Sequence, residues 1–234
     1  MPDRIVGIIG GMGPEATVDF FREIIRLTPA QKDQDHIPVV VYSDPRVPER
    51  TRAILHGGED PTPFLTRAAA ALEQAGAGIL AMPCNTAHFY LDKIRQSVRI
   101  PVLDMIEETR REAGNLSGAS RMVGLLATQG AISSGVYRVA FSRHDMELVA
   151  PEPEEQLLVQ EAIFQIKAGK YDPARQDVFE RIGTRLIARG AGAVILGCTE
   201  IPLGFVESRV DYPVVNATRV LAQAAVDWAL ERRQ

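Results

Sequence analysis

The chain of 234 residues has few cysteines, few lysines and no long hydrophobic segment. No run of apolar residues approaches the roughly 18 that a membrane-spanning helix needs, and the apolar part of the N-terminus is too short for a signal peptide. The only cysteines are Cys84 and Cys198, and no secretory signal precedes them. We therefore expect reduced thiols in a cytoplasmic protein rather than a disulfide framework.

Low positive charge and few histidines argue against nucleic-acid and metal sites. The net charge is −4 and the isoelectric point is near 5.7, so the chain lacks the basic surface that binds nucleic acid or an anionic membrane. Cys84 and His88 are spaced i, i+4, but no second cysteine or histidine flanks Cys198, so no metal site is expected. What is left is a globular protein of ordinary composition, long enough for a sizeable core.

The chain contains an internal repeat. The segment RIVGIIGGMGPEATVDFFREI at residue 4 is similar to RMVGLLATQGAISSGVYRVAF at residue 121. GAGILAMPCNTA at residue 76 is similar to GAGAVILGCTEI at residue 190, and IPVLDMIEET at residue 100 is similar to YPVVNATRVL at residue 212. The offsets of 112 to 117 residues are too long for a solenoid repeat and indicate two duplicated halves.

Within the first half, short apolar runs alternate with segments of helical periodicity. The expected strands are 5–9, 39–42 and 79–82, and the expected helices are 16–27, 62–75 (closed by Gly76) and 85–97. This alternation indicates parallel sheets covered by helices on both faces. We therefore expect an α/β fold of two pseudo-symmetric, duplicated domains. The first is expected at 1–103, with the segment 213–234 packing back on it, and the second at 104–212.

Both cysteines follow an apolar, strand-like run at the point where the next helix is expected. In open α/β sheets, ligands bind at the carboxyl ends of the strands, and a helix N-terminus lowers the pKa of a thiol. A free cysteine is often only a buried core residue. The equivalent positions of Cys84 and Cys198 in two duplicated halves favour a shared site instead. We expect both thiols to face one cleft with lowered pKa values.

Two further segments leave the same predicted sheet edge. GMGPEA at 11–16 fits the G-x-G-x-x-G/A pattern of dinucleotide sites, but Asp44, the first acid at a strand end, comes later than the roughly 20 residues expected. Binding of a ligand carboxylate at the helix N-terminus explains the glycines equally well. The loop SDPRVPER at 43–50 carries Arg46 and Arg50, which are either surface charges or binding groups for a carboxylate.

Together these motifs resemble a known protein family. GGMGPEAT, PERT, MPCNTAH, GLLATQGAISSGVY, IKAG and GCTE occur in order from Gly10 to Glu200, as in the aspartate/glutamate racemase family, and the sequence is most similar to its aspartate racemases. The resemblance implies a cofactor-independent amino-acid racemase, usually a homodimer, with its active site in the cleft between two pseudo-symmetric domains. One departure is that Gln129 and Ala131 stand where relatives often carry threonines.

The resemblance also assigns roles to individual residues. It implies that Cys84 and Cys198 are the catalytic acid/base thiols. The substrate-binding residues that it implies are Met12, Arg50, Asn85, Thr86, Thr128, Lys167, Thr199 and Glu200. Among these, Arg50 and Lys167 match the positions that grip the substrate carboxylates in aspartate racemases. Judged by its own position alone, Lys167 at the end of a predicted helix is equally a partner of the helix dipole.

The residue types suit racemisation without a cofactor. Inverting an α-carbon requires removal of a proton from one face and delivery of a proton to the other, and two thiols of tunable pKa can do both. A pyridoxal racemase would need a Schiff-base lysine and a phosphate site, and neither is recognisable around the four lysines. We expect no cofactor and an acidic amino acid as substrate, aspartate first and glutamate second. The alternatives are a broad-specificity racemase, a maleate isomerase-like enzyme, and a non-catalytic amino-acid or dinucleotide-binding protein.

Overall fold

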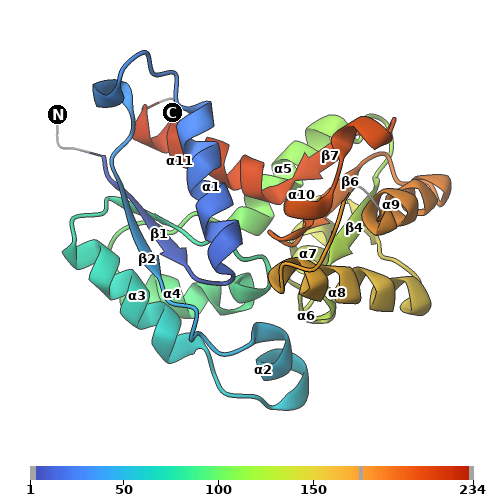
Figure 1. Ribbon diagram of the computed structural model, residues 1–234, viewed down its shortest axis with the longest axis horizontal. Helices are drawn as coiled ribbons and strands as arrows, with labels where there is room; N and C mark the ends of the chain where they lie inside the picture. The colour runs from blue at the N-terminus through green and yellow to red at the C-terminus, as the bar shows by residue number, and fades with distance from the viewer. Residues whose placement is uncertain (1–3, 174–175, 232–234) are drawn as a thin grey trace. The chain divides into compact units, whose positions relative to one another are not determined.

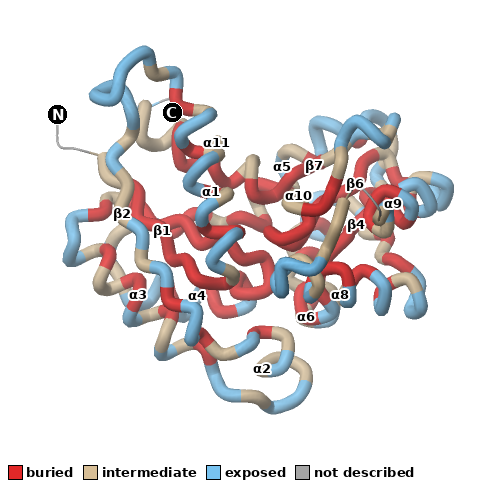
Figure 2. Tube along the Cα trace, viewed as in Figure 1, coloured by how far each residue is buried: buried red, intermediate tan, exposed pale blue. Residues whose placement is uncertain are grey.

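The chain folds as two compact units, Met1–Met105 together with Thr218–Gln234, and Ile106–Ala217. The computed structural model describes residues 4–173 and 176–231 (Figure 1). In both units the central strands are buried along almost their whole length (Figure 2). Since their backbone polar groups are paired within the sheets, apolar residues can fill these strands without leaving buried donors or acceptors unmatched.

The first unit is built on a small parallel sheet. Its strands are β1 (Val6–Gly10), β2 (Val39–Ser43) and β3 (Ile79–Ala81), in the order β2-β1-β3. Both pairings are parallel, and Val102 adds an isolated parallel bridge to Leu80 beyond β3. Because all strands run in one direction, their carboxyl ends meet at one edge of the sheet.

Helices cover both faces of this sheet. The helical segments of this unit are α1 (Pro14–Leu27), η1 (Asp33–Asp35), α2 (Arg50–His56), α3 (Thr62–Gln74), η2 (Thr86–Tyr90), α4 (Leu91–Ser97) and α11 (Ala217–Ala229). Figure 1 shows α3 and α4 on one side of the sheet and α1 on the other. Two glycines of β1 let the helices approach: a Cβ atom on Gly7 would meet Leu72 of α3, and one on Gly10 would meet Thr17 of α1.

The second unit has a four-stranded parallel sheet. Its strands are β4 (Met122–Ala127), β5 (Glu147–Val149), β6 (Val194–Gly197) and β7 (Val214–Asn216), in the order β5-β4-β6-β7. The strand β7 pairs with β6, so it belongs to this unit, and the C-terminal part of the first unit begins at Thr218.

The helices of the second unit are α5 (Met105–Leu116), α6 (Gln129–Ser133), α7 (Val136–Ser142), α8 (Pro153–Lys167), α9 (Val178–Ala188), α10 (Ile201–Gly204) and η3 (Glu207–Arg209). Leu126 of β4 packs in one core cluster with residues of α8 and α9. Its neighbour Leu125 points to the opposite face, where it lines a cavity of about 390 Å³ with Tyr137 and Phe141 of α7.

The two units share one strand plan. In the order β2-β1-β3 followed by the Val102 bridge, the first unit matches the order β5-β4-β6-β7 of the second. The expected strands and the helices 16–27 and 62–75 of the first half lie within two residues of the observed elements, and Gly76 has the left-handed φ of 90° of a helix C-cap. The α/β fold with duplicated, helix-covered parallel sheets is thus confirmed.

The helix expected over 85–97 is wrong in its first part. Residues Thr86–Tyr90 form a 3₁₀ helix, and the α-helix begins only at Leu91. The backbone N–H of His88 donates to the carbonyl of Asn85, three residues back, at 3.1 Å. The carbonyl of Cys84, which would accept this bond in an α-helix, is instead 2.9 Å from Nδ1 of the His88 ring. A side chain thus competes with the regular helical bond at this turn.

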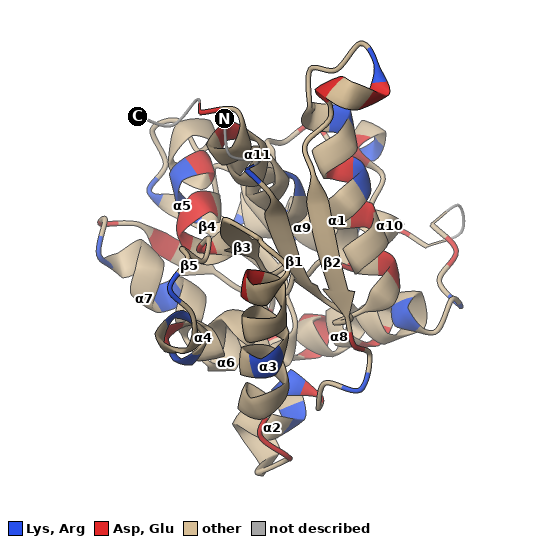
Figure 3. Cartoon of the chain, turned by 90° about the vertical axis from the view of Figure 1, so that its left-hand side faces the viewer, with Lys and Arg blue, Asp and Glu red and all other residues tan. Residues whose placement is uncertain are grey.

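In the first unit, charged residues lie on the helices and loops. Figure 3 shows both signs interspersed over the first unit's helices, while β1, β2 and β3 carry none. Within the part of the chain that the structure describes, no helix combines the length and the apolar character needed to cross a membrane.

Candidate active site

In the first unit, the expected site residues follow the carboxyl ends of the strands. Met12 lies just beyond β1, and Cys84, Asn85 and Thr86 lie just beyond β3. Met12 and Cys84 are both buried and belong to one core cluster. The structure therefore brings these two motifs together at one edge of the sheet, where ligands bind in open α/β folds.

Arg50 is a buried cation at the same edge. It begins α2 after the loop from β2, and only 8% of its surface is exposed. Its Nη1 atom donates to the carbonyls of Val47 and Pro48 at 3.2 and 3.1 Å, and its Nε atom is buried without a hydrogen-bond partner. Within the described ranges, no carboxylate forms an ion pair with it. A buried charge left in this state is costly, so the site favours an anionic ligand.

The other arginine of this loop is already paired. Arg46 donates to both carboxylate oxygens of Asp44 at 2.8 and 2.9 Å. The hydrogen bonds from Arg46 are the main reason why the pKa of Asp44 is lowered to about 2. Of the two arginines that the sequence offered, Arg50 is therefore the one whose charge is not already paired with a carboxylate.

In the second unit, Cys198, Thr199 and Glu200 directly follow β6, and all three are buried. The Sγ atom of Cys198 donates to Oε2 of Glu200 at 3.0 Å. The other oxygen of Glu200 lies 3.8 Å from Nζ of Lys167, the last residue of α8. Glu200 has a side chain only 4% exposed and Lys167 one 29% exposed, so this thiol, carboxylate and ammonium meet in a partly dry place.

The expectation of a lowered thiol pKa is wrong for Cys198. Burial, followed by the negative charge of Glu200, raises its pKa well above the usual range, and Lys167 opposes this only in part. The helix after this cysteine, α10, has only four residues. A helix this short provides little of the dipole that the expectation relied on. The sequence showed the helix start but not its length or the position of the Glu200 carboxylate.

Thr128 caps the turn that follows β4. Its Oγ1 atom accepts a hydrogen bond from the backbone N–H of Ala131 at 3.1 Å, which satisfies a free donor of α6. Gln129 donates its backbone N–H to the side chain of Gln160 at 2.8 Å. Gln129 and Ala131, the two positions noted above as departures from the resemblance, are therefore part of an ordered turn.

Sequence reasoning missed Gln156. This buried residue of α8 donates from Nε2 to the carbonyl of Ala127, the last residue of β4, at 2.9 Å, and its Oε1 atom is buried without a partner. It therefore anchors the strand end that precedes Thr128. A glutamine inside a helical pattern gives no sign in the sequence that it faces a strand end rather than solvent.

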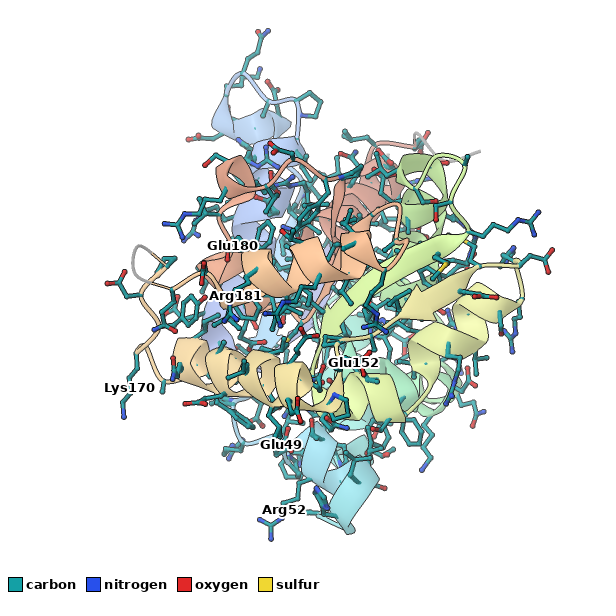
Figure 4. The ribbon with its side chains drawn as sticks, turned by 90° about the vertical axis from the view of Figure 1, so that its right-hand side faces the viewer. Glu49, Arg52, Glu152, Lys170, Glu180 and Arg181 are labelled. Atoms are coloured by element: carbon teal, nitrogen blue, oxygen red, sulfur yellow. The ribbon has the colours of Figure 1, made fainter. Side chains whose placement is uncertain are left out.

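Figure 4 shows the side chains of Arg52 and Lys170 pointing away from the protein. Each of these exposed residues lies within three positions of a site cation, Arg50 or Lys167. They are therefore suitable controls for substitutions of the site residues.

These features define an α/β protein with one buried cysteine at the carboxyl edge of each of two duplicated sheets. The sequence profile of the Asp/Glu/hydantoin racemase family matches residues 9–225. The chain belongs to this family and is therefore an isomerase, an amino-acid racemase that acts on small molecules.

Two relatives match almost the whole chain, and a third matches part of it. The structure of Picrophilus torridus aspartate racemase superposes with a TM-score of 0.86 at 33% identity, covering 97% of this chain and 94% of that one. The broad specificity amino-acid racemase RacX of Bacillus subtilis is 26% identical over 97% of this chain and 98% of its own length. A glutamate racemase of Corynebacterium kroppenstedtii is 30% identical over 62% of this chain and 49% of its own length.

Proposed function

We propose that this protein interconverts L- and D-aspartate without a cofactor. Cys84 and Cys198 act as the two acid/base thiols, one on each face of the α-carbon. One thiolate removes the α-proton, and the other thiol delivers a proton to the opposite face. Asn85, Thr86, Thr128 and Thr199, with the backbone near Met12, hold the α-carboxylate and the amino group through hydrogen bonds. These contacts stabilise the carbanion electrostatically.

The observation that carries the proposal of an acidic substrate is the buried Arg50, whose charge has no carboxylate partner in the described chain. Arginine binds carboxylates through two parallel hydrogen bonds, which gives the side-chain carboxylate of aspartate a partner. Lys167 is a second cation, but its charge is shared with Glu200. We propose that Glu200 keeps its hydrogen bond with Cys198 and its ion pair with Lys167 when the substrate is bound, and that it contacts the substrate while holding both.

We take aspartate as the first candidate substrate and glutamate as the second. Among the relatives, the aspartate racemase is 33% identical and covered over 94% of its length, and the glutamate racemase of Corynebacterium kroppenstedtii is 30% identical and covered over 49%. The resemblance to aspartate racemases also supports a homodimer in the cytoplasm. A second candidate is a broad-specificity racemase, which the match to RacX over 98% of its length favours.

The test is a panel of L-amino acids, acidic and neutral, incubated with purified, cofactor-free protein and analysed by chiral chromatography. We expect D-aspartate to form fastest. Arg50→Ala should lower kcat/KM for aspartate about 10- to 150-fold, because a buried carboxylate loses a charged hydrogen-bond partner. Arg52→Ala, which changes an exposed arginine of the same helix, should leave it unchanged. Equal rates for neutral amino acids, unaffected by Arg50→Ala, would instead establish the broad-specificity racemase.

A further inference from the structure

His88 is buried, and both nitrogens of its ring are engaged. Nδ1 lies 2.9 Å from the carbonyl oxygen of Cys84, and Nε2 accepts the backbone N–H of Met105 at 3.1 Å. Since a carbonyl can only accept and an N–H can only donate, Nδ1 carries the proton and Nε2 carries the lone pair. One neutral tautomer therefore satisfies both partners.

The first of these bonds shapes the turn around the thiol. In a regular α-helix, the carbonyl of Cys84 would accept the backbone N–H of His88. Here the ring takes that carbonyl, and the backbone N–H moves to Asn85 at 3.1 Å, so the segment after the cysteine is a 3₁₀ helix. The imidazole thus sets the backbone geometry of the turn that contains Cys84 and Asn85.

The second bond fixes the ring itself. Met105 begins α5 and is the last residue of the first unit before the chain passes to the second. Its N–H is one of the helix-start donors that lack a partner within the helix. By accepting it, Nε2 gives this donor a partner and sets the orientation of the imidazole. The peptide of Cys84 is therefore tied to a backbone position 21 residues further along the chain.

We propose that His88 is the positioning residue for Cys84: it holds the Cys84 peptide in the 3₁₀ turn and anchors that turn to the start of α5. The proposal rests on the proposed function only in taking Cys84 as a catalytic thiol. Without the imidazole, the freed carbonyl can accept the regular helical N–H, and the turn can rewind toward an α-helix. The thiol would then leave its working position while the substrate-binding groups of the second unit stay in place.

Three substitutions separate the two bonds. His88→Asn keeps a donor near the position of Nδ1, His88→Gln places an amide oxygen within reach of the Met105 N–H, and His88→Ala removes both. Ile94→Ala, in the buried face of α4, serves as a destabilised control that leaves both bonds intact. We expect His88→Ala to lower kcat for aspartate about 10- to 100-fold with KM within about threefold, and His88→Asn to recover most of the loss.

A second measurement does not depend on the substrate. In a Cys198→Ala background, Cys84 is the only thiol, and its rate of alkylation by iodoacetamide reports how firmly the turn is held. We expect His88→Ala to raise this rate at least about fivefold, and His88→Asn and Ile94→Ala to leave it near that of the parent. If wild-type protein racemises no amino acid, the proposed function fails, but the alkylation rates still test the role of His88.

The proposal is overturned if His88→Ala and Ile94→Ala lower Tm alike while kcat and the alkylation rate of Cys84 stay unchanged, because His88 is then only a core residue. If His88→Ala does not fold, the comparison of His88→Asn with His88→Gln tests the proposal. Higher kcat and slower alkylation in the Asn variant support the bond to the Cys84 carbonyl. Equal values in the two variants contradict it.

Discussion

At the scale of single residues, burial and two charges of opposite sign set the acidity of the Cys198 thiol. Glu200 accepts its hydrogen bond and raises its pKa, and Lys167, on the other side of the carboxylate, lowers it. Burial is the largest cause of the raised pKa. Burial and Glu200 therefore both favour the protonated thiol of Cys198 in the resting protein.

This arrangement predicts pKa shifts of opposite sign for two substitutions. In a Cys84→Ala background, the rate of Cys198 alkylation follows its thiolate fraction and so its pKa. Glu200→Gln removes the negative charge and should move the midpoint of the pH–rate curve to lower pH. Lys167→Met removes the positive charge and should move it to higher pH. Lys170→Met, at an exposed position nearby, should not move it. Shifts of the same sign for both site variants would refute this arrangement.

At the scale of elements, the turns after β3 and β4 are each tied to a helix by a buried side chain. Gln156 of α8 donates to the last carbonyl of β4, ahead of the turn at Thr128. His88 links the turn after β3 to the start of α5. In both cases one polar side chain supplies a hydrogen bond that no strand or helix provides.

Gln156→Ala should lower the free energy of unfolding by about 1–3 kcal/mol, because the carbonyl of Ala127 loses its side-chain donor in a buried place. Urea denaturation followed by circular dichroism measures the change. Gln165→Ala is the matched control on the same helix, since the side chain of Gln165 donates to the exposed side chain of Glu161 at 3.1 Å. We expect it to stay within about 0.5 kcal/mol of wild type. Equal losses in both variants would show that Gln156 does not hold the strand end.

Because of His88, we expect the folded protein to lose stability in acid. Burial lowers its pKa below the usual value of 6.5, although Asp104 and the carbonyls of Cys84 and Leu103 oppose this, while Arg95 adds to it. The folded protein binds the proton less tightly than the unfolded chain. The stability that neutral His88 contributes is therefore present above about pH 6.5 and is lost as pH falls through the lowered pKa.

Urea midpoints measured from pH 7.5 to 4.5 test this. Wild type should lose more stability over that range than His88→Asn, which cannot be protonated there. The exposed His144 supplies the control, and His144→Asn should follow the wild-type curve. If the urea midpoint of His88→Asn falls with pH as steeply as that of wild type, protonation of His88 does not destabilise the folded protein.

The sequence predicted the regular helices and strands. It did not predict the segment where a side chain replaces a backbone group as a hydrogen-bond partner. Apolar runs and glycines located β1, β2, β3, α1 and α3, because burial and periodicity determine them. The 3₁₀ turn after Cys84 could not be predicted, since it depends on His88 reaching a carbonyl and on Met105, which is distant in sequence. The raised pKa of Cys198 depends first on burial and then on the Glu200 carboxylate, while the ammonium of Lys167 from α8 opposes both, and the sequence alone does not bring these groups together.

At the scale of the whole molecule, duplication explains why the chain has two cysteines and why both stand at sheet edges. The same strand order is used twice. Each copy places a buried thiol just beyond the third strand of its sheet along the chain, which is β3 in the first unit and β6 in the second. The proposed two-thiol racemisation needs an acid and a base on opposite sides of one carbon, and in this proposal each copy of the duplicated fold contributes one cysteine.

Alkylation of both thiols should abolish activity. Protein kept in reductant should be active, and iodoacetamide should inactivate it with a stoichiometry of two thiols per chain. L-aspartate should slow the inactivation in proportion to its occupancy of the site, whereas a neutral amino acid should not. Mass spectrometry of the alkylated protein locates the modified residues. Full activity after both thiols are modified would remove them from the mechanism.

The most direct test of the two-thiol account is deuterium exchange at the α-carbon of each enantiomer of aspartate, in D₂O and without cofactor, by wild type, Cys84→Ser and Cys198→Ser. Wild type should exchange and racemise both enantiomers. Each variant should lose racemisation in both directions, because every turnover needs a base on one face and an acid on the other. Any exchange that survives should come from one enantiomer in one variant and from the opposite enantiomer in the other. Racemisation at the wild-type rate by either variant would contradict the account.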